Sequence, residues 1–515
     1  MTSATLHRDP SSGGLSIKCL LDVLESFQPV LDGSADARIL GVQQDSRRIE
    51  PGDLFVARSG ASANGRQFIE AAIDNGAAAV LVDSDSGELS PLSVPLIYVS
   101  EARRALAFAA EAVHGYPSKQ LGLVGITGTN GKTTTVALVE RGLSVAGARP
   151  ARLGTTGFAF GGVEQESNLT TPEADQITRL IAQVVGQGGT HFIMEASSHA
   201  LDQGRVDALH FEVAAFSNLT QDHLDHHGSM AAYEAAKLRL FTNLGPTKAV
   251  INVDDPAGQR FAQISRAQQL VRVGRMPHCN VQPLDVTLNA QGMSGEIRVE
   301  DIRVHLHTRL VGEHNLENIL LALGVLHALG ADLQSAVRAF AGDFGVPGRL
   351  ERCDRSDDDI VVLVDYAHTP DALERALQAV KRFAKGSVHC VFGCGGDRDP
   401  KKRPLMGQAV GKWADRATVT NDNPRTESPD LIALAIEPGL RQTDIHYSVE
   451  LDRAVAIRAA ILEAKAGDVV VIAGKGHETY QIVGTVKRPF DDRAQAREAL
   501  SVRRRDDSGR ERACR

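Results

Sequence analysis

The sequence has no excess of positive charge, no long apolar run and few cysteines. Its 515 residues carry a net charge of -8, which gives no general attraction to nucleic acid. No stretch approaches the roughly 18 consecutive apolar residues of a membrane span, and the first 14 residues lack the apolar core of a secretory signal. We therefore expect a cytoplasmic protein that neither binds nucleic acid nor inserts into a membrane.

The cysteines do not form a metal-binding or disulfide pattern. Cys390 and Cys394 have no second pair nearby that would complete a zinc site. We expect reduced and mostly structural thiols. The six positions are Cys19, Cys279, Cys353, Cys390, Cys394 and Cys514.

The length exceeds what one hydrophobic core usually organises, and the pattern predicts an α/β fold of three domains. Short strand-like runs alternate with alanine-rich helical stretches in a small N-terminal α/β domain, residues 16–117. A central domain with a parallel sheet follows at 118–345. In residues 346–500, four strands each precede a charged or glycine-rich loop, which predicts a Rossmann-like domain. Residues 1–15 and 501–515 are expected to be disordered tails.

The chemistry begins at residues 121–135, LGLVGITGTNGKTTT. An apolar strand breaks into glycines, and Lys132 and Thr133 then open a helical pattern, as in a phosphate-binding loop. Backbone N–H groups and Lys132 would hold phosphate oxygens, and the Thr133 hydroxyl would ligate Mg²⁺. Ile126 stands where the common loop pattern has its first glycine. The expected ligand is a nucleoside triphosphate.

Several polar residues follow predicted strands, and each has a structural alternative. Glu195 ends an apolar strand, where it is suited to hold the nucleotide's Mg²⁺ or is an ordinary strand-end acid. Asp222, His223, Asp225, His226 and His227 crowd six positions, as in a zinc site or in a polar loop before a helix. By pattern alone, Lys237 lies on the solvated face of that helix.

Two asparagines and a group of strand ends complete the candidate residues. Asn315 and Asn318 lie one helical turn apart, where they either reach a nucleotide or solvate the start of a helix. In the third domain the charged residues fall at the carboxyl ends of strands, where open sheets bind ligands. Asp365, Arg398, Arg425 and Glu478 are among these residues.

In combination these motifs resemble the Mur ligases, ATP-dependent enzymes that form amide bonds in cell-wall synthesis. The match runs from about residue 45 to 482. The motifs that carry it are GTNGKTT (128–134), MEASSHAL (194–201), SNLTQDHLD (217–225), YEAAKLRLF (233–241), GEHNLENILLA (312–322), VPGRLE (346–351), DYAHTPDAL (365–373), GCGGDRD (393–399), DNPR (422–425) and GKGHE (474–478).

The resemblance implies a role for each matching residue. The residues implied in catalysis are Lys132, Glu195, His223, Lys237, Asn315, Asn318, Arg349 and Asp365. The ATP-binding set is Gly128, Thr129, Asn130, Gly131, Lys132, Thr133, Thr134, Asn315, Arg349, Asp365 and His368. Two Mg²⁺ ions are implied, with Thr133, Glu195, His223 and Lys237 as the protein ligands. Lys237 would carry a CO₂-derived carbamate (N6-carboxylysine), which reverses the pattern-based view of this residue.

The substrates implied by the resemblance are UDP-N-acetylmuramoyl-L-alanyl-D-glutamate, meso-diaminopimelate and ATP. We expect the enzyme to be a monomer. The nucleotide substrate would be held by Ser46, Thr170, Thr171, Ser197, Gln203 and Arg205. Diaminopimelate would be held by Arg398, Asp422, Asn423, Pro424, Arg425, Gly474 and Glu478. Members with the DNPR motif add diaminopimelate, because an arginine fork takes its distal carboxylate. The alternatives are a lysine-adding ligase of the same family, a folylpolyglutamate synthetase and a catalytically silent UDP-sugar-binding regulator.

Overall fold

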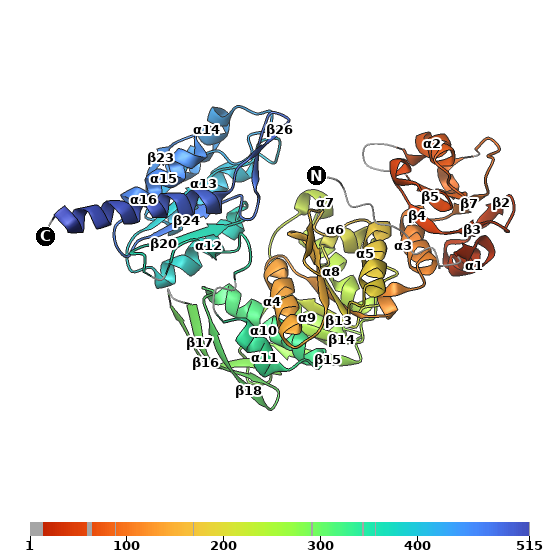
Figure 1. Cartoon of the computed structure of the whole chain (residues 1–515), viewed down its shortest axis with the longest axis horizontal. Coiled ribbons are helices and arrows are strands. Elements are labelled where there is room, and N and C mark those ends of the chain that lie inside the picture. The colour runs from red at the N-terminus through yellow and green to blue at the C-terminus, as the bar shows by residue number, and fades with distance from the viewer. Residues whose placement is uncertain are drawn as a thin grey trace. The chain divides into compact units, whose positions relative to one another are not determined.

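The computed structural model describes residues 14–58, 64–87, 89–167, 169–289, 292–341, 345–355 and 357–513. The chain divides into two compact units. The first comprises Met1–Lys132, Ala146–Arg272 and Ala328–Gly330, and the second comprises Thr133–Val145, Val273–His327 and Ala331–Arg515. Figure 1 gives the order of the elements along the chain by colour.

The first unit begins with a five-stranded sheet of order β2-β7-β6-β5-β4, in which only β2 is antiparallel. Alternate residues of β6 face opposite sides, as the two-residue period of a strand requires. Ala79 and Leu81 pack with α1 and α3, whereas Val80 and Val82 pack with α2. The elements are β1 (Leu15–Ser16), α1 (Ile17–Val23), β2 (Val30–Asp32), β3 (Arg38–Ile39), β4 (Gly41–Gln43), β5 (Asp53–Ala57), α2 (Ile69–Asp74), β6 (Ala79–Asp83), β7 (Leu96–Val99) and α3 (Ala102–Val113).

A second sheet in this unit is parallel at its centre. The strand that leads into the phosphate loop, β8 (Gly122–Thr127), pairs in parallel with β12 (His191–Glu195) and β13 (Val213–Phe216). β9 (Pro150–Gly154) and β14 (Lys248–Asn252) extend the parallel part, and β10 (Gly157–Phe160) and β11 (Val163–Gln165) add an antiparallel edge. The sheet predicted to be parallel is therefore mixed. The helices of this unit are α5 (Ala174–Gly186), α6 (Ser198–Asp202), α7 (Leu224–His227), α8 (Met230–Thr242) and α9 (Pro256–Ile264). The helix after the phosphate loop, α4 (Lys132–Val145), belongs to the second unit apart from Lys132.

The division between the units falls within β15 (Gln269–Val273). The second unit continues with the antiparallel strands β16 (Val281–Asn289), β17 (Gly292–Val299) and β18 (Ile302–Thr308). Two helices follow, α10 (Glu313–Ala328) and α11 (Leu333–Ala339).

The rest of the second unit is a six-stranded sheet of order β19-β20-β24-β21-β22-β23. All of its pairs are parallel except β19 with β20. α12, α13 and α14 cover one face and α15 and α16 the other, which is the doubly covered arrangement expected of a Rossmann-like sheet. The elements are β19 (Glu351–Arg352), β20 (Val361–Asp365), α12 (Pro370–Phe383), β21 (Val388–Phe392), α13 (Lys402–Trp413), β22 (Arg416–Val419), α14 (Pro429–Leu440), β23 (His446–Val449), α15 (Arg453–Glu463), β24 (Val469–Ala473), β25 (Tyr480–Val483), β26 (Val486–Pro489) and α16 (Asp492–Ala513).

The C-terminal segment differs from the expectation of a disordered tail from residue 501. α16 continues to Ala513, and Arg503 binds the Asp359 carboxylate through two nitrogens at 2.8 and 2.6 Å. These ion pairs attach the helix to a loop before β20, which a reading of the tail alone does not reveal. Of the predicted N-terminal tail, residues 1–13 lie outside the described residues, and Leu15 pairs with Ile39.

The predicted α/β class with three domains is confirmed, whereas the domain boundaries stay predictions. The five cysteines in the described part of the chain are free thiols, and four of them are buried. No helix among the described residues is long and apolar enough to cross a membrane.

Candidate active site

The phosphate loop, residues 128–131, is fixed by the segment that follows β13. Thr129 N–H donates to the Asn218 carbonyl at 2.8 Å, and the Ser217 hydroxyl donates to the Asn130 carbonyl at 2.6 Å. Gly128 has φ 143°, and a methyl group there would lie 1.9 Å from the Ser217 hydroxyl oxygen. Only glycine allows this approach.

Two lysines converge on one carbonyl of this loop. Lys132 Nζ donates to Gly128 O at 2.9 Å, and Lys237 Nζ donates to the same oxygen at 2.8 Å. Burial lowers the pKa of Lys237 well below its ordinary value, and Lys132 lowers it further. The surroundings of Lys237 therefore favour the neutral form of its amine more than water does.

The pattern-based prediction of a solvated Lys237 is wrong, because its side chain is only 1% exposed. α8 buries Tyr233, Ala236, Lys237, Leu240 and Phe241, which recur at the spacing of one helix face. The apolar residues Tyr233, Ala236 and Leu240 define a helix face that includes position 237, and this spacing could have predicted that Lys237 is buried.

Glu195 lies at the carboxyl end of β12, opposite Ile126 of β8. Its carboxylate is 1% exposed and accepts bonds from the Thr155 N–H at 2.8 Å and the Thr155 hydroxyl at 3.2 Å. A methyl group on Gly154 would lie 2.3 Å from this carboxylate. Glycine therefore leaves the room that the acid occupies.

The donor set fits Mg²⁺ if Lys237 supplies oxygen. Glu195 is a buried carboxylate, and carboxylate and hydroxyl oxygens are the ligands that Mg²⁺ prefers. His223 precedes α7 with φ 51°, in the left-handed region. The buried Lys237 amine would repel a cation when protonated, whereas a carbamate on it would attract one.

The residues implied in nucleotide-substrate binding form a connected group around α6. The Thr171 hydroxyl donates to the Glu195 carbonyl at 2.7 Å and accepts from the Ser197 N–H at 3.1 Å. Arg205 donates to the Thr171 carbonyl at 2.7 Å and to Gln203 Oε1 at 2.7 Å. The Thr170 hydroxyl lies 3.2 Å from that of Thr155. Ser46 lies apart in η2 (Ser46–Arg48), where its carbonyl accepts from Asn75 at 3.0 Å.

Sequence reasoning missed two arginines that join this group from the N-terminal domain. Arg103 donates to Gln203 Oε1 at 2.9 Å, and both Arg58 and Arg205 lie 3.2 Å from Glu173. Burial lowers the pKa of Arg58 and of Arg205, and Arg103 lowers both further. Arg58 and Arg205 thus share one carboxylate, and Arg103 bonds to the neighbouring Gln203. No local pattern marked them, because Arg103 and Gln203 are 100 positions apart.

The two asparagines lie in the first turns of α10 and are 2% and 4% exposed. Asn315 Nδ2 donates to the Val311 carbonyl at 2.8 Å, and Asn318 Nδ2 donates to Asn315 Oδ1 at 3.3 Å. These bonds stabilise the start of the helix from inside the protein, whereas the structural alternative placed the two side chains in solvent. Contact with a nucleotide stays a prediction.

Three implied residues lie near the edge of the six-stranded sheet: Asp365 is the last residue of β20, His368 follows that strand, and Arg349 precedes β19. The Asp365 carboxylate accepts from the N–H groups of Leu350 at 2.7 Å and Ala367 at 2.8 Å. Burial raises the pKa of Asp365, and Arg349 opposes the shift. The Arg349 guanidinium lies 5.2 Å from the centre of the Tyr366 ring, and His368 Nδ1 lies 2.8 Å from the Tyr366 carbonyl.

The structure brings most of the implied amino-acid-binding residues together around a buried lysine. Lys475 is fully buried, and its Nζ donates to Glu478 at 2.9 Å and to Asn423 at 3.0 Å. Asp422 lies 3.8 Å from the same nitrogen. Burial alone would raise the pKa of Glu478, but Lys475 and Asn423 hold it below its ordinary value. Lys475 could have been predicted to join this group, because it lies between the implied residues Gly474 and Glu478 in the motif GKGHE.

Arg425 has a strained backbone with φ 51°, which few non-glycine residues adopt away from functional sites. Its N–H donates to the Ile482 carbonyl at 3.1 Å, and its Nη1 donates to the Gly396 carbonyl at 2.6 Å. The hairpin of β25 and β26 thus fixes the backbone while the side chain turns toward the loop after β21. Arg398 is exposed in that loop, Pro424 is buried, and the Gly474 N–H donates to the Asp365 carbonyl at 3.0 Å.

Strand, glycine loop and helix, with a buried acid on the neighbouring strand, define a nucleotide-binding protein of the phosphate-loop class. Known domains match three parts of the chain: "Mur ligase family, catalytic domain" at residues 38–114, "Mur ligase middle domain" at 126–326 and "Mur ligase, glutamate ligase domain" at 348–476. The chain belongs to the Mur ligase family, as its motifs predicted.

Similar proteins cover nearly the whole chain. The UDP-N-acetylmuramoyl-L-alanyl-D-glutamate--2,6-diaminopimelate ligase of Gloeobacter violaceus is 46% identical over 91% of this chain and 95% of its own length. The ligase of the same name from Geobacillus thermodenitrificans is 42% identical over 95% of this chain and 100% of its own. A solved structure of a ligase of that name, 34% identical, aligns with TM-score 0.69 over 95% of this chain and 99% of that one.

Proposed function

We propose that this protein is an ATP-dependent ligase that adds meso-diaminopimelate to the D-glutamate of UDP-N-acetylmuramoyl-L-alanyl-D-glutamate. The observation that carries the proposal is the pair of lysines on the Gly128 carbonyl, one of them buried and depressed in pKa. Similarity to diaminopimelate ligases over more than nine tenths of the chain supports the choice of substrates. ATP and a UDP-linked substrate assign the reaction to the cytoplasm.

The reaction needs activation because a carboxylate is a poor electrophile toward an amine. A γ-carboxylate oxygen of D-glutamate attacks the γ-phosphorus of ATP, the bond to ADP breaks, and an acyl phosphate forms. The amine of diaminopimelate then attacks the acyl carbon, loses its proton, and expels phosphate as the amide forms. Lys132 and the loop N–H groups hold the phosphates and offset the charge of the approaching carboxylate.

Lys237 takes part as a carbamate. Its neutral nitrogen attacks the carbon of CO₂, an N–C bond forms, one oxygen becomes anionic, and the nitrogen loses a proton. Depression of the pKa by burial and by Lys132 supplies the neutral amine that this step requires. Glu195, His223, Thr133 and the carbamate would hold Mg²⁺, which would supply positive charge against the phosphate oxygens.

The arginine group around α6 binds the nucleotide substrate. Arg58 and Arg205 share the Glu173 carboxylate, and the Arg103 guanidinium bonds to the neutral Gln203 amide. Guanidinium groups gathered in this way suit phosphate and carboxylate groups. The Ser197 N–H donates to the Thr171 hydroxyl, which ties the start of α6 to the Thr170-Thr171 segment. The acidic groups of the substrate would bond to the three guanidinium groups.

The cluster around Lys475 selects the amino acid. Asp422 and Glu478 carry two negative charges against one on Lys475, so the cluster has a net affinity for an ammonium group. Arg425 supplies a fork for a carboxylate at the other end. Diaminopimelate offers both groups on its distal carbon, whereas lysine offers only the ammonium. This difference favours diaminopimelate over the lysine-adding alternative.

Product analysis tests the proposal. The purified chain, given ATP, Mg²⁺, bicarbonate and the UDP-linked substrate, should form ADP and a product heavier by one diaminopimelate residue when meso-diaminopimelate is present. L-Lysine or L-glutamate in its place should give little product. A product containing lysine at equal rate would replace the proposal with the lysine-adding alternative, and no product under any condition would favour the silent regulator.

A further inference from the structure

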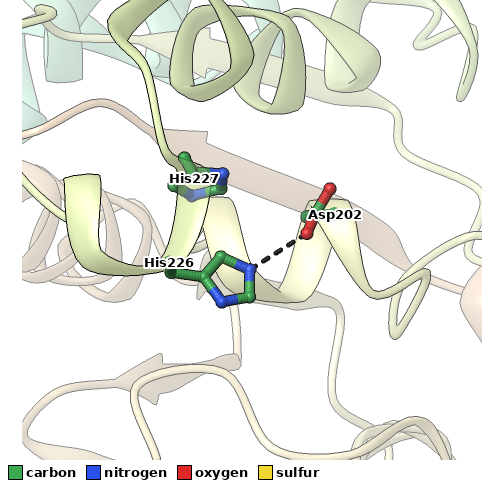
Figure 2. Close-up of side chains that lie close together, drawn as sticks. All are labelled: Asp202, His226 and His227. Carbon is green, nitrogen blue, oxygen red and sulfur yellow. Dashed lines mark hydrogen bonds and ion pairs between the residues drawn. The ribbon is translucent and has the colours of Figure 1, made fainter.

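Three side chains next to the candidate active site form a cluster that the proposed reaction does not use. Asp202 ends α6, and His226 and His227 end α7. One potential ligand atom from each residue lies within 4.8 Å of those of the other two. Figure 2 shows the Asp202 carboxylate and the two imidazole rings around a common space, with a dashed line from His226 to Asp202.

The geometry within the cluster resembles a ligand set. His226 Nε2 lies 3.0 Å from Asp202 Oδ2, and the centres of the His226 and His227 rings are 4.7 Å apart. His199, also on α6, lies with its ring centre 4.2 Å from that of His226. Four side chains with metal-binding atoms therefore meet where α6 and α7 approach each other.

A second observation points to a missing partner. His227 Nε2 is buried and has no hydrogen-bond partner within the described part of the chain. A buried polar atom without a partner destabilises the folded protein, and native structures contain few such atoms. A cation coordinated by the imidazole would satisfy the group, and the exposed Asp202 and His226 leave a path for its entry.

We propose that Asp202, His226 and His227 bind one transition-metal dication of the zinc class. Two imidazole nitrogens with one carboxylate suit Zn²⁺, Ni²⁺ or Co²⁺, whereas most ligands of a Mg²⁺ site are oxygen atoms. Metal–ligand bonds of about 2.0 to 2.2 Å place ligand atoms about 3 to 3.5 Å apart. The ligand atoms now lie up to 4.8 Å apart, so side-chain rotations must bring them about 1 Å closer to one another. The exposed side chains of Asp202 and His226 permit this movement.

Such an ion would join α6 to α7. Arg239 already holds the end of α6, because its guanidinium donates to the carbonyls of Leu201 and Asp202. The ion would add the end of α7 to this anchor. α7 directly follows His223, and α6 directly follows Ser197, so the link would fix both residues relative to each other. The site is distinct from the Mg²⁺ ligands Glu195, His223 and Lys237.

Cobalt binding to the full-length protein tests the proposal. We would titrate Co²⁺ into the protein in the presence of millimolar Mg²⁺ and follow visible absorption and heat, with His226→Ala and Asp202→Asn as the site variants. His305→Ala removes an exposed histidine of β18 and is the matched control. Glu195→Gln separates this site from the Mg²⁺ site.

The expected result is one equivalent of Co²⁺, displaced by Zn²⁺, with affinity lowered at least tenfold by either site variant. Both His305→Ala and Glu195→Gln should bind as the parent does. Zn²⁺ should raise the thermal unfolding temperature of the parent and the controls but not of His226→Ala. An unchanged circular dichroism spectrum of His226→Gln would show that loss of binding does not come from misfolding. Absence of binding, or binding that only Glu195→Gln abolishes, would overturn the proposal.

Discussion

Glu111→Gln should remove a pH-dependent loss of stability from the N-terminal domain. Glu111 lies on α3, is 1% exposed and accepts from the Ser118 hydroxyl at 2.7 Å. Burial raises the pKa of this carboxyl from 4.5 to about 7, against the opposing effect of Ser118. A raised folded-state pKa means that the folded protein holds the proton more tightly than the unfolded chain. The resulting stability is complete below pH 4.5 and is lost as pH rises through 7.

The magnitude follows from the shift. One pKa unit corresponds to about 1.4 kcal/mol, so the folded state loses about 2.5 kcal/mol from this group between pH 5 and pH 8. Glutamine keeps the neutral shape and cannot ionise. The free-energy difference between the variant and the parent should therefore shift in favour of the variant by this amount over the same interval.

Hydrogen exchange of the α3 amides, followed by mass spectrometry, measures the effect in the intact chain. Comparing parent and variant at each pH cancels the intrinsic exchange rate. Glu70→Gln, at an exposed position of α2, is the control and should show no pH-dependent difference. A difference between parent and Glu111→Gln that stays constant from pH 5 to pH 8 would refute the reasoning.

Three further substitutions test the second unit and the phosphate loop. Arg453 donates to the fully buried Asp492 carboxylate at 2.7 and 2.6 Å, and Arg453→Ala leaves this carboxylate without its partner. The free energy of unfolding, measured with denaturant, should fall by roughly 3 to 5 kcal/mol. A decrease below about 1 kcal/mol would contradict this role of Arg453. Lys237→Ala should lose ligase activity and regain part of it with formate, whereas Lys132→Ala should not respond to formate, and full activity of Lys237→Ala without added carboxylate would exclude the carbamate. Arg425→Lys keeps the charge but loses the fork, so kcat/KM for meso-diaminopimelate should fall about tenfold to a hundredfold, equivalent to about 1.5 to 3 kcal/mol, with little change for L-lysine; equal kcat/KM for the two amino acids in the parent would refute this assignment.

Local patterns were sufficient wherever neighbouring residues determine the structure. The glycines and Lys132-Thr133 located the phosphate loop, because turn geometry and helix N-termini depend on adjacent residues. The apolar strand predicted to end at Glu195 is β12 (His191–Glu195). Lys237 was misplaced for a different reason: a charged residue was assigned to solvent although its helical neighbours Tyr233 and Leu240 are buried.

Contacts between distant segments could not be predicted from the sequence. The arginine group depends on pairs such as Arg58 with Glu173 and Arg103 with Gln203, which no periodicity links. The end of α16 gave the same difficulty, since its order depends on Arg503 meeting Asp359, 144 positions away. The partners of each charged residue had to come from the three-dimensional structure.

An isotope-transfer measurement tests the acyl phosphate most directly. The UDP-linked substrate would carry ¹⁸O in the γ-carboxylate of D-glutamate, and the phosphate released during ligation would be analysed by mass spectrometry. Attack of this carboxylate on ATP predicts that each phosphate acquires one labelled oxygen, in step with amide formation. Phosphate without label, released while the amide forms, would contradict the account.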